Sequence, residues 1–215
     1  EHFIHTIKTT DEDDIDTIKS LREAIMMFEA LHTVEIKILT VERMGYENLY
    51  QYHNLAATVF TGECLLMRTD HHFCVTTGWD DKIRDNIKPH LAEPIVIHQN
   101  GINEQVWWAT AWGINKKWYD VSTNNGQIQA FSEVGMDVWL LRIAEQCNLQ
   151  IIKAGYDMVS MQRGMENANK IGGHDYCLPD DETLFDTRES KGKRNTEPEV
   201  RKALTENLKN WKHKN

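Results

Sequence analysis

The sequence predicts an α/β fold, in which helices cover a β-sheet that contains parallel strands. Up to about residue 100, segments with the alternating, β-branched pattern of strands take turns with segments of helical periodicity. One strand segment, 64–69 (CLLMRT), is apolar through most of its length, which is typical of a strand buried on both faces. Two acidic segments, residues 11–14 and Asp70, directly follow predicted strands, so we expect both at one rim of the sheet, where ligands bind in folds of this class.

The first part of the chain supplies three strands and two helices. Strands are predicted at 3–9, 34–42 and 64–69, and amphipathic helices at 15–31 and 47–60. A helix between two strands allows a crossover connection, so these strands can lie parallel to one another in one sheet.

The second part continues the pattern less regularly. A helix is predicted at 79–87, strands at 94–98 and 106–112, a further helix at 136–147 and a final strand at 150–160. The helix at 79–87 follows a Thr-Gly pair that suits the start of a helix.

The chain ends in a polar segment and an amphipathic helix. Residues 161–195 show little periodicity and indicate a long loop. A Thr-x-x-Glu capping box at Thr196, with Pro198 in the first turn, predicts a helix over 196–215. Its apolar stripe packs on the body of the protein or on a partner protein. The stripe consists of Val200, Leu204, Leu208 and Trp211. We therefore divide the chain into a domain at 1–160, a loop-rich segment at 161–195 and this helix.

The charge distribution argues against nucleic acid as the partner of the main body. The 215-residue chain has a formal charge of -9. Residues 191–215 carry eight Lys or Arg and three Asp or Glu, a net charge of +5, which leaves -14 on residues 1–190. An acidic body repels phosphates, because binding them requires clustered Lys and Arg. We interpret the basic tail as a solvated helix face, with contact to RNA or an acidic partner as the alternative.

Other sequence features narrow the class of protein. No segment of the sequence approaches the about 18 uninterrupted apolar residues of a membrane span. Cysteines at 64, 74, 147 and 177 form no C-x-x-C motif of the zinc-binding type. No charged-then-apolar signal opens the sequence. We therefore expect reduced thiols and a cytoplasmic location.

Short motifs in the middle of the chain add a resemblance. Their order is similar to that in the central part of family 2-like nucleotide-sugar glycosyltransferases with the GT-A fold. In that family a helix ending in ATG precedes a buried strand, an Asp-rich metal motif and GWD. The motifs here are 45–49 (GYENL), 52–56 (YHNLA), 61–66 (TGECLL), 69–71 (TDH) and 78–80 (GWD).

Two acidic segments extend the resemblance to about residues 5–185. Residues 10–14 (TDEDD) resemble the acidic turn after the family's second strand. Residues 135–140 (GMDVWL) resemble the later acidic segment that supplies the catalytic base. The resemblance implies a GT-A-like mixed, mostly parallel sheet flanked by helices, with the C-terminal helix as a tail. It also implies transfer of a sugar from a nucleotide-diphospho-sugar to a hydroxyl acceptor, with Asp137 as the general base of an inverting reaction.

The resemblance also implies a donor site. Asp70, with His71 and His174, would hold Mn²⁺ or Mg²⁺ on the diphosphate of the donor. Asp11 and Asp13 would contact the base and ribose of the nucleotide. A His can ligate Mn²⁺ but lacks the negative charge that hard cations prefer, so the sequence leaves the use of a metal open.

Each of these residues also has a purely structural interpretation. Asp70 would cap a turn, and Asp11 and Asp13 would cap the helix that follows them. Asp137 would stabilise the first turn of its helix through the helix dipole. His174 would lie on a surface loop.

Three tryptophans could line a sugar-binding site or fill the protein core. Trp107, Trp108 and Trp112 lie on one predicted strand. Tryptophans line sugar sites by stacking on pyranose rings, but they fill protein cores more often. We favour core packing for this group.

Two features depart from the family and support other functions. The PTRNR-like nucleotide-binding turn has no match, so the sequence lacks the βα unit that carries it, about 30 residues; a strand with such a turn upstream of Glu1 would favour the enzyme. Asp-His-His stands where the family has Asp-Asp or Asp-x-Asp. These features favour a non-catalytic GT-A-like binding or structural protein of a larger assembly, reached through the C-terminal helix. A metal-dependent hydrolase using Asp70, His71 and His174 is the third hypothesis.

Overall fold

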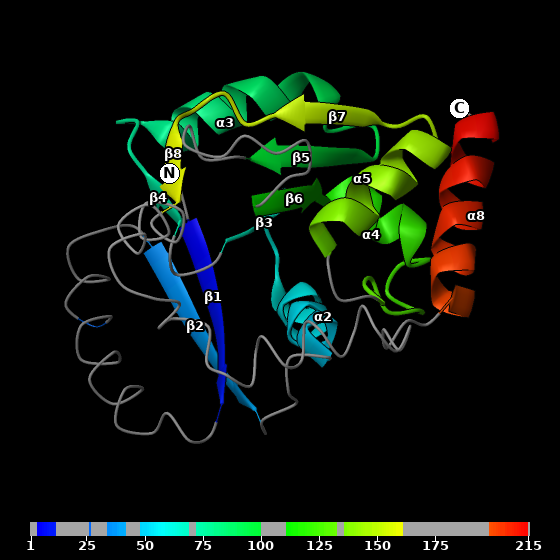
Figure 1. Ribbon diagram of the computed structural model, residues 1–215, viewed down its shortest axis with the longest axis horizontal. Helices are drawn as coiled ribbons and strands as arrows, with labels where there is room; N and C mark the ends of the chain where they lie inside the picture. The colour runs from blue at the N-terminus through cyan, green and yellow to red at the C-terminus, as the bar shows by residue number, and fades with distance from the viewer. Residues whose placement is uncertain are drawn as a thin grey trace, which may run out of the picture.

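A computed structural model of the chain describes residues 4–11, 26, 34–41, 48–68, 72–99, 111–132, 136–160 and 198–214. Strands β1 (Ile4–Asp11) and β2 (Val34–Val41) pair in parallel over their whole length, from Ile4 opposite Val34 to Asp11 opposite Val41. They form a two-stranded sheet of their own (Figure 1). The strands predicted here are thus confirmed. The helix predicted at 15–31 lies outside the described residues, apart from Met26, which is helical.

The central sheet has four strands in the order β3-β6-β5-β7. Their bounds are Cys64–Met67 for β3, Ile95–Gln99 for β5, Ala111–Asn115 for β6 and Gln150–Lys153 for β7. Strand β6 pairs antiparallel with both β3 and β5, whereas β7 pairs parallel with β5. Strands β3, β5 and β7 therefore share one direction, and β6 runs against them.

The expected mostly parallel sheet is not found in this sheet, since two of its three pairings are antiparallel. The connection from β5 to β6 comprises only residues 100–110. A parallel crossover needs a dozen or more residues, so a connection of this length favours an antiparallel return. The fold is α/β with a mixed sheet.

The last strand predicted for the domain differs in the structure. The strand expected at 150–160 is two strands, because Gly155 adopts a φ of 80° and turns the chain between β7 and β8 (Met158–Ser160). Strand β8 pairs antiparallel with β4 (His72–Cys74), a strand that the sequence did not predict.

Four helices confirm predicted helices, and two further elements are new. The confirmed helices are α2 (Leu49–Val59), α3 (Trp79–Ile87), α5 (Met136–Gln146) and α8 (Pro198–Lys214). The new elements are α4 (Lys116–Ser122) and the 3-10 turn η3 (Lys88–His90). In the described part of the chain, no helix is long and apolar enough to cross a bilayer.

Helix α4 begins where one buried side chain joins three segments. The Oδ1 atom of Asn115 accepts hydrogen bonds from the Trp118 amide, 2.9 Å away, and from the Ile95 amide, 3.1 Å away. Its Nδ2 atom donates to the Glu93 carbonyl at 2.7 Å. Asn115 therefore caps α4 and ties the end of β6 to the start of β5.

The four-stranded sheet separates two hydrophobic cores, because successive side chains of a strand point to opposite faces. The large core lies between the sheet and helices α2, α4, α5 and α8, and includes Val96 and Ile114 from the sheet. The small core lies under α3 and consists of Ile83, Ile87, Ile95, Ile97 and Ala154. The largest rings of the large core are Trp112, Trp118, Phe131 and Trp139.

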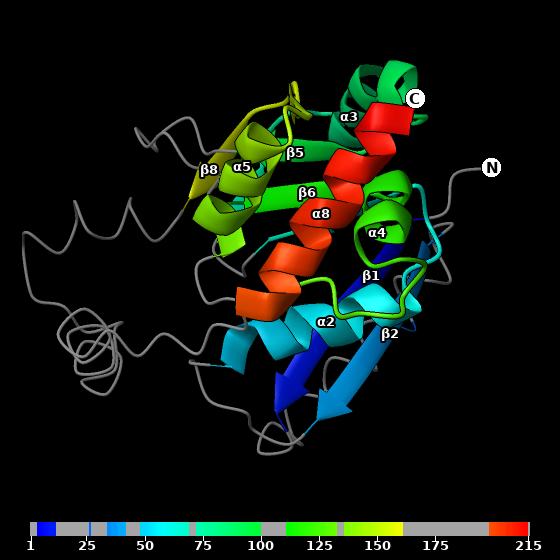
Figure 2. The ribbon, with the colours of Figure 1, turned by 90° about the vertical axis from the view of Figure 1, so that its right-hand side faces the viewer.

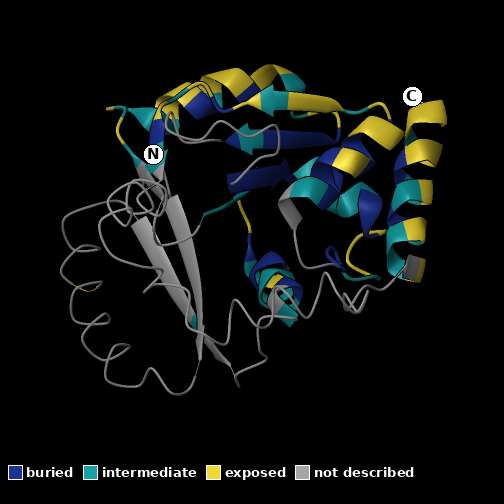
Figure 3. Cartoon of the chain, in the orientation of Figure 1, coloured by how far each residue is buried: buried dark blue, intermediate teal, exposed yellow. Residues whose placement is uncertain are grey.

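Helix α8 packs on the body, as one of the two sequence interpretations requires. Leu204 and Leu208 are fully buried in the large core. The Asn207 side chain donates to the Ser122 carbonyl at 2.8 Å, which fixes α8 against α4. Figure 2 shows α8 beside α4, and Figure 3 shows that its outward side is exposed. The apolar stripe is therefore used within this chain.

Candidate functional site

One edge of the four-stranded sheet gathers the ends of three strands. Because β3, β5 and β7 share a direction, their carboxyl ends lie at the same edge (Figure 1). Helix α5 leads into β7 through the short turn at 147–149 and packs against β5 and β7. In α/β sheets, ligands bind beyond the carboxyl ends of the strands. This edge is therefore where functional side chains are expected.

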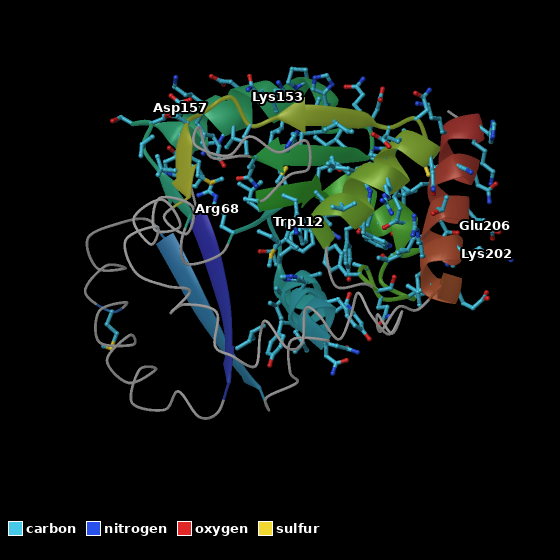
Figure 4. All side chains as sticks on the ribbon, in the orientation of Figure 1. Arg68, Trp112, Lys153, Asp157, Lys202 and Glu206 are labelled. Carbon is cyan, nitrogen blue, oxygen red and sulfur yellow. The ribbon has the colours of Figure 1, made fainter. Side chains whose placement is uncertain are left out.

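Arg68, which directly follows β3, is held in a polar and aromatic cage. Its Nε atom donates to Oε1 of Gln99, the last residue of β5, over 3.2 Å. An Nη2 hydrogen is donated to the hydroxyl of Tyr156, which follows β7. The guanidinium carbon lies 4.4 Å from the centre of the Trp79 ring and 5.2 Å from that of Tyr156. We call these four residues the Arg68 cage; Figure 4 labels Arg68 among the side chains, on the side of the molecule away from α8.

The cage is locked by a second layer of hydrogen bonds. Gln99 is only 2% exposed, and its Nε2 atom donates to the Trp112 carbonyl at 3.0 Å. Its Oε1 atom is thereby turned toward Arg68, and it also accepts the hydroxyl hydrogen of Tyr156. Trp79 and Tyr156 meet edge to face at 5.7 Å. Each contact fixes the same orientation of the guanidinium.

The cage carries a net positive charge. Burial raises the pKa of Tyr156 to about 12, with a further rise from Cys74 and an opposing effect of Arg68, so the phenol is neutral at pH 7. Gln99 and Trp79 bear no charge. In the described part of the chain, ion pairs join Arg84 with Asp80 and Asp81, and Lys116 with Asp120; none includes Arg68.

Most of the site residues expected from the sequence lie outside the described residues. These are Asp13, Asp70, His71 and His174. In the sequence, Asp70 stands two positions after Arg68 and two before the start of β4. No set of three His, Cys, Asp or Glu within the described residues could hold a metal ion.

Two of the expected residues can be placed by their backbone alone. Asp137 is the second residue of α5, the helix that leads into β7. Asp11 is the last residue of β1, which belongs to the separate two-stranded sheet. The argument that Asp11 and Asp70 follow strands of one sheet is not confirmed by the described pairings. The side chains of Asp11 and Asp137 lie outside the described part.

The interpretation of Trp112 as a core residue is confirmed. It is 5% exposed and packs edge to face with His53 at 5.5 Å and with Phe131 at 5.0 Å. Trp107 and Trp108 lie outside the described residues. Core packing is therefore established for Trp112, which belongs to the large core.

The described cysteines do not supply a reactive thiolate. Cys64, Cys74 and Cys147 are free thiols. Burial, together with the charge of Glu63, raises the pKa of Cys64 to about 12. Burial also raises the pKa of Cys74 and of Cys147. All three thiols are thus protonated at pH 7 and are poor nucleophiles.

Sequence reasoning missed the residues of the Arg68 cage. Arg68 and Gln99 each follow an apolar strand segment, CLLM and IVIH, and a polar residue in that position is a usable signal. Tyr156 lies 57 positions beyond Gln99 and joins it only through the sheet. Such a contact has no local sequence pattern.

Comparison with known proteins gives no relative for this chain: no family model, no curated protein and no solved structure matches it. The function is therefore argued from the edge of the sheet and from the motifs that lead into it.

Proposed function

We propose that this chain is a GT-A-like glycosyltransferase that moves a sugar from a nucleotide-diphospho-sugar to a hydroxyl acceptor. One observation carries the proposal. Asp70 comes three residues after β3, whose carboxyl end lies at the same edge of the sheet as those of β5 and β7, and Asp137 is the second residue of α5, the helix that leads into β7. A donor-binding carboxylate and a base are needed at one edge of the sheet for such a transfer. The order of the motifs around β3 supports the same function.

In this proposal Asp137 does the proton chemistry. Its carboxylate takes the proton of the acceptor hydroxyl while that oxygen bonds to the anomeric carbon of the sugar. The bond from the anomeric carbon to the diphosphate breaks, and the nucleoside diphosphate leaves with the electron pair. A single displacement of this kind inverts the anomeric configuration.

Asp70, His71 and His174 would hold the diphosphate of the donor through a metal ion. Asp70, His71 and His174 offer carboxylate and imidazole ligands, a donor set that suits Mn²⁺ and, through the carboxylate, Mg²⁺. When bound, such an ion neutralises charge on the leaving diphosphate. Asp11 and Asp13 would contact the base and ribose.

A binding measurement tests the donor site first. We expect UDP- or GDP-sugars with Mn²⁺ to raise the melting temperature by a few degrees, because a ligand at one hundred times its Kd adds about 2.7 kcal/mol. Asp70→Ala should abolish the shift. Asp85→Asn, which alters an exposed aspartate on α3, is the matched control and should leave it unchanged.

A turnover measurement then separates the base from the donor site. Asp137→Asn should keep the nucleotide-dependent melting shift but lower sugar transfer, or hydrolysis of the donor, by about 10² to 10⁴-fold. A folded wild-type protein that binds no nucleotide would overturn the proposal. Binding without any turnover would favour the non-catalytic relative instead.

A further inference from the structure

The Arg68 cage holds a cation whose described partners are all neutral. Among the described residues, the side chain of Arg68 contacts Gln99, Tyr156 and Trp79, none of which bears a negative charge. A half-buried cation is costly unless an anion compensates it, because burial removes part of its hydration. Within the described part of the chain, no anion compensates the charge of Arg68.

The same geometry shows which hydrogens are left for an anion. A guanidinium has five N–H groups, and the cage uses one on Nε and one on Nη2. Both hydrogens of Nη1 and one of Nη2 have no partner among the described residues. Two donors on neighbouring nitrogens form the fork that matches two oxygens of a phosphate.

The contacts of the cage hold the guanidinium of Arg68 in one orientation. Gln99 is fixed by the Trp112 carbonyl, so its oxygen cannot turn away from Arg68 without losing that bond. Tyr156 and Trp79 confine the plane of the guanidinium by their rings. A fixed fork loses little conformational freedom on binding, which increases its affinity for a ligand of matching shape.

We propose that Arg68 binds a phosphate group, specifically one phosphate of the diphosphate of the nucleotide donor, at the carboxyl edge of the sheet. This assignment rests on the proposed function for the identity of the donor. The anion-binding role itself rests on the cage alone. Arg68 is thus a binding residue, and Gln99 and Tyr156 are positioning residues that act through it.

Calorimetry with four probes tests the assignment at constant ionic strength: UDP, GDP, inorganic pyrophosphate and uridine. In the wild type we expect binding of pyrophosphate and of one nucleoside diphosphate. Arg68→Met should weaken both at least about tenfold, since a hydrogen bond between charged groups contributes more than a neutral one. Binding of uridine, which has no phosphate, should change little.

Two further variants keep the test informative if Arg68→Met does not fold. Gln99→Glu keeps the size of the side chain and places a carboxylate where the amide oxygen accepts from Arg68. That carboxylate competes for the guanidinium, so we expect pyrophosphate and nucleotide binding to weaken although Arg68 is intact. Tyr156→Phe removes one fixing contact and should have a smaller effect than Gln99→Glu.

The matched control is Arg84→Gln, which changes another arginine close to the cage. Arg84 lies on α3, the helix that Trp79 begins, and pairs with Asp81 at 2.7 Å. Its loss should leave every affinity within twofold of the wild type. A general effect of removing positive charge would instead weaken binding equally in Arg84→Gln and Arg68→Met, and would overturn the assignment.

The outcomes separate this inference from the proposed function. Nucleotide binding that is equal in wild type, Arg68→Met and Gln99→Glu overturns the role of Arg68 and leaves the transferase proposal standing. Binding of pyrophosphate that requires Arg68, with no binding of either nucleotide, supports the anion site and overturns the nucleotide donor. Absence of binding by all probes overturns both.

Discussion

The two faces of the four-stranded sheet differ in how they are closed. The large core is covered by four helices and filled with aromatic rings, of which Trp118, Phe131 and Trp139 are at most 2% exposed. The small core is aliphatic and lies under α3 alone. At the carboxyl edge the small core is closed by polar and aromatic side chains, the Arg68 cage.

This difference indicates that the two faces of the sheet have different roles, one in stability and one in positioning a ligand site. The large core includes residues from α2 to α8 and thus joins distant parts of the chain, which makes it the main source of stability. The small core positions Arg68 and its partners at the edge where a ligand is expected. Substitutions on the two faces should therefore affect different properties.

A pair of isoleucine substitutions tests this division most strongly. Ile114 on β6 faces the large core and Ile97 on β5 the small core, and both are fully buried. We expect Ile114→Ala to lower the free energy of unfolding by about 3 to 5 kcal/mol, and Ile97→Ala by about 2 to 3 kcal/mol. The cavity under α3 can shrink by a shift of one helix, whereas four helices constrain the large core. Urea denaturation measures both.

Ile151→Ala supplies the control for this pair. Ile151 lies on β7 and is 37% exposed, so its truncation should cost less than either buried isoleucine. Equal losses for Ile114→Ala and Ile97→Ala would show that the two cores respond alike, and the comparison would fail.

Acidification should lower the free energy of unfolding through His53, which packs on rings of the large core. Burial lowers the pKa of His53 to about 4, beside the rings of Trp112 and Phe131. As the pH falls below about 6.5, the unfolded chain binds a proton that the folded protein excludes until the pH approaches 4. The free energy of unfolding should therefore decrease between pH 6.5 and 4, by up to about 3 kcal/mol from this group.

His53→Phe separates this contribution from the other titrating groups. The phenyl ring keeps the packing against Trp112 but binds no proton, so the variant should lose less stability than the wild type over the same pH range. Urea midpoints at pH 7, 5.5 and 4.5 measure the difference. Parallel curves for the two proteins would contradict the assignment to His53.

A glycine on the small-core face should give the smallest of the three effects. Gly155 has a φ of 80°, and a Cβ atom there would clash with Nδ2 of Asn86. Gly155→Ala should cost about 1 to 2 kcal/mol through the left-handed backbone and the displaced amide. That amide donates to the carbonyls of Lys153 and Ala154, so its displacement also loosens the turn before Tyr156.

A double-mutant cycle with Asn86→Ala distinguishes the two causes in Gly155→Ala. If the clash with Asn86 contributes, the double variant will be more stable than the sum of the single losses predicts. If the losses simply add, the backbone conformation alone accounts for the cost.

The sequence predicted the strongly patterned elements and missed those set by tertiary contacts. Strand β3 was predictable because all four of its residues are apolar, and helix α8 because a capping box precedes apolar residues at helical spacing. The strand predicted at 106–112 overlaps β6 only at its end, since β6 extends through Gly113. A side chain at Gly113 would meet Leu66 Cδ2 at 2.7 Å, so this glycine allows close packing of β6 that propensity does not indicate.

Helix α4 was missed because it is short and depends on its cap. Its seven residues show little periodicity, but Asn115 in front of it is a favourable N-cap residue and could have indicated the helix. For the site, the sequence placed Asp137 in the first turn of a helix, and this is confirmed. It could not indicate Gln99 and Tyr156 as partners of Arg68, since only the pairing of β5 with β7 brings these chain segments together.

Helix α8 has a consequence for how the protein is made in the cell. Leu204 and Leu208 seal the large core, yet they follow the last strand by many residues. Ribosomes add roughly 5 to 20 residues per second, so about 3 to 10 s pass between synthesis of Ser160 and of Lys214. Until α8 is made, the surface of α4 against which it packs is uncovered. We therefore expect the nascent chain to be most prone to aggregation before α8 has packed on α4.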